Sequence, residues 1–149
     1  GQILNYIGDS IMVVFGAPNK LKGHENKAIE CAMMMREKLK ELNHSWDEND
    51  TSRYWKNHGI DSITMRIGIH TGSVIAGNVG SQEMLQYSTI GDTVNVASRL
   101  EQANKDYNTD ISLSHEIYTS LTKELHDQAS LSGEIILKGR TSPTKVYSI

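Results

Sequence analysis

The segment that most constrains this chain is residues 87 to 100, Y-S-T-I-G-D-T-V-N-V-A-S-R-L, which predicts a polar turn running into a helix. Asp92 or Thr93 is expected to cap that helix. Asn95 and Arg99 then lie one turn apart on one face. The apolar residues of the opposite face are Val94, Ala97 and Leu100. Exposed amide and guanidinium donors at this spacing could stabilise negative charge on a phosphoryl oxygen. Spacing alone favours the alternative of a solvated helix face without a special partner.

A second segment, I-L-N-Y-I-G-D-S-I-M-V-V-F-G at residues 3 to 16, predicts two apolar strands joined at Gly8 and Asp9. Gly-Asp is a favoured pair for a tight hairpin turn. A carboxylate at such a tip projects from a rigid sheet, and Mg²⁺ is usually held by one or two carboxylates together with substrate phosphates. Considered alone, Asp9 is only a turn residue.

A third segment, M-R-I-G-I-H-T-G-S-V-I-A-G-N-V-G at residues 65 to 80, predicts another hairpin of strand, turn and strand. Arg66 and His70 share one face of its first strand. The apolar residues of the other face are Ile63, Met65, Ile67 and Ile69. Six histidines occur in the chain, but none of their spacings matches a zinc signature. A turn or packing role is therefore expected for His70.

Together with L-K-G-R at residues 137 to 140, these segments resemble the class III nucleotidyl cyclases, the catalytic domain of adenylyl and guanylyl cyclases. Bacterial adenylyl cyclases are the most similar members. The resemblance implies an α+β fold, the ferredoxin-like class III cyclase sandwich, with residues 1 to 149 forming one catalytic domain. In the family an opening strand with a motif like F-x-D-I-x-G-F and two helices precede the first hairpin. The chain is expected to lack that strand and those helices, which would leave a sheet edge unpaired.

The resemblance also implies roles for single residues. Asp9 matches one of two metal-binding aspartates, and Arg66 and Lys138 match ligands of the triphosphate. Asn95 and Arg99 match the residues that orient the ribose and stabilise the transition state as the 3′-hydroxyl attacks the α-phosphorus. The implied cofactor is a pair of Mg²⁺ or Mn²⁺ ions, for which the second aspartate is absent from this chain. Residues 1 to 149 alone are therefore expected to be inactive.

Asn5 and Ser88 match the two positions that read the purine. Adenine-selective members commonly have Lys with Asp or Thr there, and guanine-selective members have Glu with Cys or another small residue. Asn and Ser both carry donors and acceptors without charge, and no Glu is present to accept hydrogen bonds from guanine. We therefore expect an adenylyl cyclase that converts ATP to cyclic AMP and pyrophosphate. The alternatives are a guanylyl cyclase and a non-catalytic regulatory or dimerisation module.

In the family the active site forms between two domains arranged head to tail. A homodimer is thus implied, in which one chain supplies Asp9 and Arg66. The residues that the partner chain supplies to that site would be Asn5, Ser88, Asn95, Arg99 and Lys138. An upstream sensor or regulatory domain in the full-length protein is expected to control the relative orientation of the two chains.

Composition adds limits on partners and compartment. The net charge of −3 gives no electrostatic basis for nucleic-acid binding. Cys31 is the sole cysteine and falls in a predicted helix, so a reducing compartment is expected. No apolar run reaches the ~18 residues of a membrane span. The catalytic domain is therefore expected in the cytoplasm, with any membrane anchor elsewhere in the full-length protein.

The remaining elements follow from hydrophobic spacing. Residues 24 to 43 are expected to form an amphipathic helix. Its predicted apolar stripe is Ala28, Ala32, Met35, Leu39 and Leu42. Beyond the central motifs we expect a strand at residues 111 to 113, a helix at 116 to 125, and closing strands at 134 to 137 and 145 to 148.

Overall fold

The structure is a computed structural model that describes residues 1–81, 84–136 and 143–149. Its strands are β1 (Gln2–Ile7), β2 (Ser10–Val14), β3 (Ile67–Ile69), β4 (Ile75–Ser81), β5 (Met84–Ile90), β6 (Ile111–Ser114), β7 (Ser130–Ile135) and β8 (Thr144–Ser148). Its helices are α1 (His24–Glu48), α2 (Arg53–Lys56), α3 (Asp92–Tyr107), α4 (His115–Tyr118) and α5 (Lys123–His126). Helices and strands are mixed along the chain, so the expected α+β class is confirmed.

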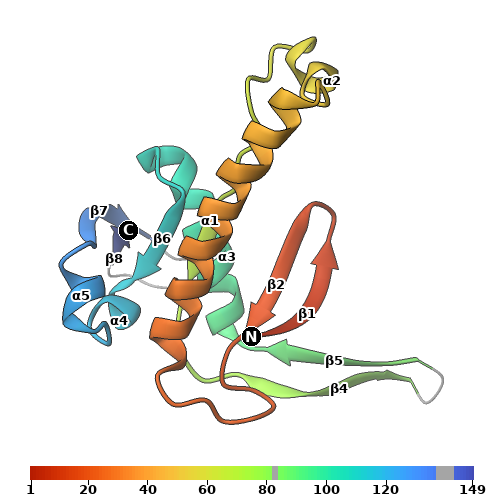
Figure 1. The fold of residues 1–149 in the computed structure, drawn as a ribbon. Helices are drawn as coiled ribbons and strands as arrows, with labels where there is room; N and C mark the ends of the chain where they lie inside the picture. The colour runs from red at the N-terminus through yellow and green to blue at the C-terminus, as the bar shows by residue number, and fades with distance from the viewer. Residues whose placement is uncertain (82–83, 137–142) are drawn as a thin grey trace.

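A four-stranded sheet in the order β3-β6-β8-β7 forms the centre of the fold. β3 runs parallel to β6, and the other pairs are antiparallel. The hairpins β1-β2 and β4-β5 are separate two-stranded sheets. In the view of Figure 1, α1 and α3 lie between the four-stranded sheet and the β1-β2 hairpin. Among the described residues β3 and β7 are the edge strands of this sheet.

Two groups of buried apolar side chains hold the helices on the sheet. The larger group is Ile29, Ala32, Ile69, Ile111, Leu113, Ile117, Leu125 and Tyr147. The smaller group is Val96, Leu100 and Val146. Every residue of β6 is buried, which suits a strand that pairs on both sides and is covered by helices. The first group packs α1 on the sheet and the second packs α3 on it.

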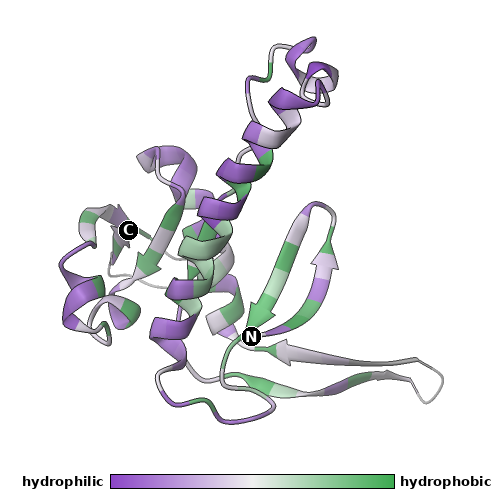
Figure 2. Cartoon of the chain, viewed as in Figure 1, coloured by the Kyte–Doolittle hydropathy of each residue, from purple (hydrophilic) through white to green (hydrophobic). Residues whose placement is uncertain are grey.

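Helix α1 begins where the sequence predicted but ends at Glu48 rather than at residue 43. Trp46 packs edge to face on Trp55 of α2, with ring centroids 5.4 Å apart, and this contact prolongs the helix. Lys56 bonds Asp47 at 2.5 Å, and that hydrogen bond lowers the pKa of the Asp47 carboxyl. Figure 2 shows the resulting end of α1 with α2 as mainly hydrophilic and the middle of α1 as more hydrophobic.

The predicted apolar stripe of α1 is only partly correct. Ala32 is buried, but Met35 and Leu42 are 38% and 47% exposed. Ile29 is fully buried, so the covered face is rotated from the predicted one towards Ile29 and Ala32. Cys31 lies within α1 as expected and is half-buried. No helix in the described ranges combines the length and apolar character that crossing a membrane requires.

The expected hairpin over residues 65 to 80 is wrong. β3 pairs with β6, and β4 pairs with β5 instead, in a register that places Gly77 opposite Ser88. Residues 87 to 90, expected as part of a polar turn, are therefore the end of a strand. Apolar alternation reveals a strand but does not identify its partner, and the parallel partner of β3 lies far along the chain.

The expected helix over residues 116 to 125 is divided into α4 and α5. The side chain of Asn26, on α1, accepts from the backbone amide of Thr122 at 2.9 Å and donates to the carbonyl of Ser120 at 3.2 Å. These bonds engage backbone groups that a continuous helix would use internally. The closing strands are confirmed in kind. β7 begins before the predicted residue 134, and Leu137, its predicted end, lies outside the described residues.

Gly68 in β3 allows the sheet to approach α3 closely. A Cβ at this position would lie less than 3.0 Å from backbone atoms of Ala97, Leu100 and Glu101 in α3. We expect Gly68→Ala to lower the free energy of unfolding by about 3 kcal/mol, because helix and strand must separate. Thermal unfolding should show a fall in Tm of roughly 6–12 °C. Gly77→Ala is the matched control, since a Cβ there meets nothing within 4 Å. Equal Tm values for the two variants would contradict the close approach.

Candidate functional site

Helix α3 presents Asn95 and Arg99 to solvent, and both side chains are exposed. The buried residues of the helix are Val96, Leu100, Ala103 and Asn104. The prediction that Asn95 and Arg99 share an exposed face is therefore confirmed. The connection from the preceding strand is short, because β5 ends at Ile90 and α3 begins two residues later.

The predicted cap of α3 is wrong. Gly91 occupies the cap position, which has no side-chain cap hydrogen bond, and Asp92 is the first helical residue. The Thr93 hydroxyl donates instead to the carbonyl of Ser73 at 2.9 Å. The Thr93 hydroxyl, which the sequence predicted as a possible helix cap, is thus bonded to Ser73 in the segment before β4. This hydrogen bond fixes the start of α3.

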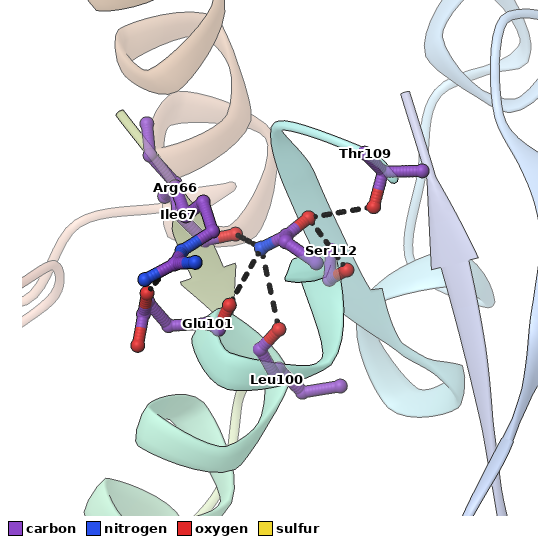
Figure 3. A network of polar contacts seen from close by, with 7 residues as sticks. Arg66, Ile67, Leu100, Glu101, Thr109 and Ser112 are labelled. Carbon is purple, nitrogen blue, oxygen red and sulfur yellow. Dashed lines mark hydrogen bonds and ion pairs between the residues drawn. The ribbon is translucent and has the colours of Figure 1, made fainter. Parts of the chain in front are cut away.

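Asn104 is the residue of this region that sequence reasoning missed. Asn104 is 1% exposed. Its side chain donates to the carbonyl of Ile67 in β3 and accepts from the hydroxyl of Ser112 in β6, and both of these partners are labelled in Figure 3. The sequence did contain a signal for this role, because Asn104 follows Leu100 by four residues and so falls on the buried side of the helix. An amide in such a position must be hydrogen-bonded. Asn104 is therefore a structural residue on the buried side of α3, the side away from the exposed Asn95 and Arg99.

Asp9 lies at the exposed tip between β1 and β2, as predicted. Gly8 supplies the positive φ of 62° that this tight turn needs. The exposed carboxylate suits a hard cation, which requires oxygen ligands and leaves room for substrate phosphates. Within the described ranges, no three His, Cys, Asp or Glu side chains gather into a metal-binding group. Asp9 alone therefore represents the expected metal site in this part of the chain.

The two predicted purine-reading residues lie on neighbouring strands. Asn5 is half-buried in β1, and Ser88 is half-buried in β5. β1 and β5 contact one another. Figure 1 shows the start of β1 beside the end of β5, close to where α3 begins. The fold thus brings together the strands that carry the two residues. Their role in base reading stays a prediction.

Arg66 immediately precedes β3, and its Nε donates to the Glu101 carboxylate of α3 at 2.9 Å. The side chains of Arg66 and Glu101 are 46% and 34% exposed. Contact with a triphosphate would require Arg66 to turn away from Glu101 or to share its guanidinium between two anions. The triphosphate role of Arg66 stays a prediction. Lys138, the other predicted triphosphate ligand, lies outside the described residues.

His70 has a packing role, as the sequence predicted. Its side chain is 6% exposed, and Nδ1 lies 2.8 Å from the Ser114 hydroxyl and 3.7 Å from the Glu116 carboxylate. Both contacts reach the same ring nitrogen. These contacts join the end of β3 to the start of α4.

Comparison with known proteins agrees with this geometry. The family described as the adenylate and guanylate cyclase catalytic domain matches residues 3–149. Adenylate cyclase 1 of Rhizobium meliloti is 35% identical over 149 residues, which cover 100% of this chain and 21% of that protein. The chain thus spans about a fifth of the length of that curated relative.

Two solved structures show the same fold. The adenylyl cyclase CyaB from P. aeruginosa has a TM-score of 0.74 at 30% identity, over 99% of this chain and 70% of that one. The guanylyl cyclase Cya2 has a TM-score of 0.75 at 28% identity, over 99% of this chain and 68% of that one. Because the family matches almost the full length of this chain, the chain belongs to the adenylate and guanylate cyclase catalytic domains, the class III nucleotidyl cyclases.

Proposed function

We propose that this chain is part of an adenylyl cyclase catalytic domain that converts ATP to 3′,5′-cyclic AMP and pyrophosphate. The observation that carries the proposal is the exposed pair Asn95 and Arg99 on α3. This helix is fixed near its start to the carbonyl of Ser73 and near its end to β3. The adenylate cyclases of Rhizobium meliloti and Anabaena cylindrica, 35% and 30% identical to this chain, support the choice of ATP.

The reaction is an intramolecular phosphoryl transfer. The ribose 3′-hydroxyl loses its proton and attacks the α-phosphorus, and the new O–P bond closes the cyclic phosphodiester. The bond to the bridging oxygen breaks, and pyrophosphate leaves with its electron pair. Such chemistry depends on positioning and charge stabilisation rather than on covalent work by the protein. Asn95 would orient the ribose, and the Arg99 guanidinium would bind the charge that develops on the α-phosphate.

Asp9 would hold Mg²⁺ or Mn²⁺ at the hairpin tip, together with the second aspartate that the family resemblance implies. Bound metal supplies charge neutralisation at the phosphates and lowers the pKa of the attacking hydroxyl. Lys138 would contact the triphosphate. Because Asp9 and α3 serve different sites in the proposed head-to-tail homodimer, two identical chains would form two equivalent sites. An upstream regulatory domain could then control turnover through the relative orientation of the chains.

The resemblance implies that the domain needs a metal-binding aspartate outside residues 1–149. We expect these residues alone to form almost no cyclic AMP, since one carboxylate holds two metal ions poorly. A chain extended at its N-terminus to the length of the cyclase domains it matches should form cyclic AMP with Mg²⁺ or Mn²⁺. Chromatographic assay of cyclic AMP from ATP checks both statements. The control is the extended chain with that upstream aspartate changed to Ala. Robust turnover by residues 1–149 would show that the missing ligand has been misread.

A guanylyl cyclase is the second candidate, because Cya2 and the receptor-type guanylate cyclase gcy-28 of Caenorhabditis elegans also match. In the extended chain we expect kcat/KM for ATP to exceed that for GTP by on the order of tenfold, the effect of one neutral hydrogen bond. Asn5→Glu with Ser88→Cys should shift the preference towards GTP. Gln2→Glu, which adds the same charge to an exposed position of β1, is the matched control. Faster cyclic GMP formation by the unchanged sequence would reject the adenine assignment.

A non-catalytic dimerisation module is the third candidate. Such a module has no chemical need for all five residues that match the family's functional positions, which are Asp9, Arg66, Asn95, Arg99 and Lys138. Retention of these residues favours an enzyme. Absence of turnover in the extended chain with either purine nucleotide would favour the module.

A further inference from the structure

We propose that Thr93 and Gly72 are positioning residues that fasten the start of α3 to the base of the β4-β5 hairpin. By doing so they fix the placement of Asn95 relative to Ser88. Thr93 acts through a hydrogen bond to another element, and Gly72 leaves the room that this bond needs. The inference rests on the proposed cyclase function, in which Asn95 would orient the ribose and Ser88 would read the purine.

One hydrogen bond joins the start of α3 to the segment before β4. The Thr93 hydroxyl donates to the carbonyl of Ser73 at 2.9 Å. The bond connects two different elements, whereas the cap position itself, Gly91, has no side-chain cap hydrogen bond. The end of a helix frays readily when no side chain caps it and no other contact holds it. Thr93 therefore provides a restraint that the cap position does not supply.

Gly72 leaves the space that the Thr93 hydroxyl occupies. A Cβ at position 72 would lie 2.7 Å from Oγ1 of Thr93 and 3.4 Å from its Cγ2. The φ of Gly72 is not positive, so the conflict is steric rather than one of backbone conformation. Thr93 is β-branched and has few rotamers with which to avoid the contact. A side chain at position 72 would therefore turn the hydroxyl away from Ser73.

The contact lies where the β4-β5 hairpin meets α3. Ile75, the first residue of β4, pairs with Ile90, the last residue of β5. The chain enters the hairpin through residues 72 to 74 and leaves it through Gly91. These two segments lie close together, because a Cβ on Gly91 would be 3.3 Å from the carbonyl oxygen of Ser73. Strand pairing thus brings the start of α3 to the hairpin base, where the hydroxyl bond forms.

Asn95 is well placed to depend on this contact. It is the fourth residue of α3 and follows Thr93 by two residues, or ~3 Å along the helix axis. At roughly 100° per residue, the two side chains project about 160° apart. Thr93 therefore holds one side of the helix start while Asn95 faces solvent on the other. Fraying of this end would displace Asn95 more than Arg99, which lies a turn further on, beside the buried Leu100.

The same contact sets the separation of the two groups that would hold the nucleoside. Ser88 lies on β5, two residues before the strand ends, and Asn95 lies on α3. Base and ribose are bonded to each other in the substrate, so the residues that bind them must keep a fixed separation. A misplacement of about 1 Å can cost two orders of magnitude in rate. Loss of the contact should therefore lower kcat, while the triphosphate contacts that support binding remain.

The decisive experiment compares three substitutions in the extended chain. Thr93→Val removes the hydroxyl at nearly constant shape and should lower kcat about tenfold, with KM for ATP within about twofold. Thr93→Ser keeps the donor and should stay within about threefold of the unchanged kcat. Gly72→Ala should reproduce Thr93→Val, because it displaces the same hydroxyl. Steady-state assays of cyclic AMP formation give both constants.

Thr119→Val is the matched control. It removes the same kind of bond, from the Thr119 hydroxyl to the carbonyl of Glu116 at 3.1 Å, at the end of α4. Its kcat should equal that of the unchanged chain. All variants are compared at temperatures equally far below their own Tm values, so that a general loss of stability does not contribute. A folded Thr93→Val variant with unchanged kcat would overturn the proposal, and so would a Thr93→Ser variant as slow as Thr93→Val.

A double-mutant cycle tests whether Thr93 acts through Asn95. Asn95→Ala alone is expected to lower kcat about a hundredfold and to leave measurable turnover, since Arg99 stays in place. Adding Thr93→Val should lower kcat by at most about twofold more, because the side chain that Thr93 positions is already absent. A further fall of about tenfold would mean that the two residues act independently, which contradicts a positioning role.

Amide hydrogen exchange gives a readout that needs no turnover. The amides of residues 96 to 98 donate to carbonyls in the first turn of α3 and should exchange about tenfold faster in Thr93→Val and Gly72→Ala. Residues 104 to 107, at the other end of the helix, should keep their rates. Unchanged exchange at residues 96 to 98 would overturn the proposal in an active or an inactive chain. Faster exchange in variants of a chain that forms no cyclic nucleotide would uphold the contact at the helix start and reject the cyclase function.

Discussion

Arg99→Ala in the extended chain is expected to lower kcat by two to three orders of magnitude, equivalent to about 3 kcal/mol of transition-state stabilisation. The loss should fall mainly on kcat, because the charge that Arg99 meets develops only as pyrophosphate departs. Arg99→Lys keeps the positive charge but loses the planar fork of donors, so it should recover only part of the rate. Steady-state assays of cyclic AMP formation give kcat and KM for each variant.

Lys105→Ala provides the matched control for this result. It removes another long basic side chain from the exposed surface of α3, in its last turn. Its effect on kcat should stay within about twofold, with a small change in helix stability from the lost charge at the helix end. Equal losses in the two variants would mean that general surface charge, rather than the position of Arg99, accounts for the effect.

Mixing Asp9→Ala chains with Arg99→Ala chains is expected to recover roughly a quarter of the activity of the unchanged dimer. Each homodimer should be nearly inactive, because every site lacks either its metal carboxylate or its guanidinium. In a mixed dimer the two lesions fall together in one site and leave the other intact. With random exchange about half of the dimers are mixed, and each of these has half of its sites intact.

The same mixture discriminates between two arrangements of the site. If one chain supplied both Asp9 and Arg99 to the same site, every site in the mixture would carry a lesion and activity would stay at the level of the separate variants. Subunit exchange is confirmed with two affinity tags before activity is measured. Exchanged dimers without recovery would reject the shared site, and a recovery near one quarter would support it with either purine as substrate.

The parts of the fold that the sequence predicted are those determined by neighbouring residues. The turn at Gly8 and Asp9 follows from the local preference for positive φ, and the exposed face of α3 follows from helical periodicity. The start of α1 was predicted for the same reason. A strand was expected at residues 111 to 113, and β6 spans Ile111–Ser114. Of the candidate site, these local signals predicted the exposure of Asp9, Asn95 and Arg99.

The parts that the sequence did not predict depend on distant partners. β3 pairs with β6 rather than with β4, and Asn26 of α1 divides α4 from α5. The carbonyl of Ser73 accepts a hydrogen bond from the hydroxyl of Thr93, and Gly91 occupies the cap position of α3. Likewise, Arg66 meets Glu101 only after β3 and α3 have packed. Each of these contacts joins residues from different elements, and periodicity within one segment carries no information about them.

The β1-β2 hairpin has a practical consequence for handling the protein. Ile3, Ile7 and Ile11 are 50%, 62% and 50% exposed, and Tyr6 beside them is 70% exposed. In the ribbon of Figure 2, much of the hairpin has the green of hydrophobic residues. Exposed apolar strands promote intermolecular association. Preparations of residues 1–149 should therefore have limited colloidal stability, and light scattering should rise with concentration well before the core begins to unfold.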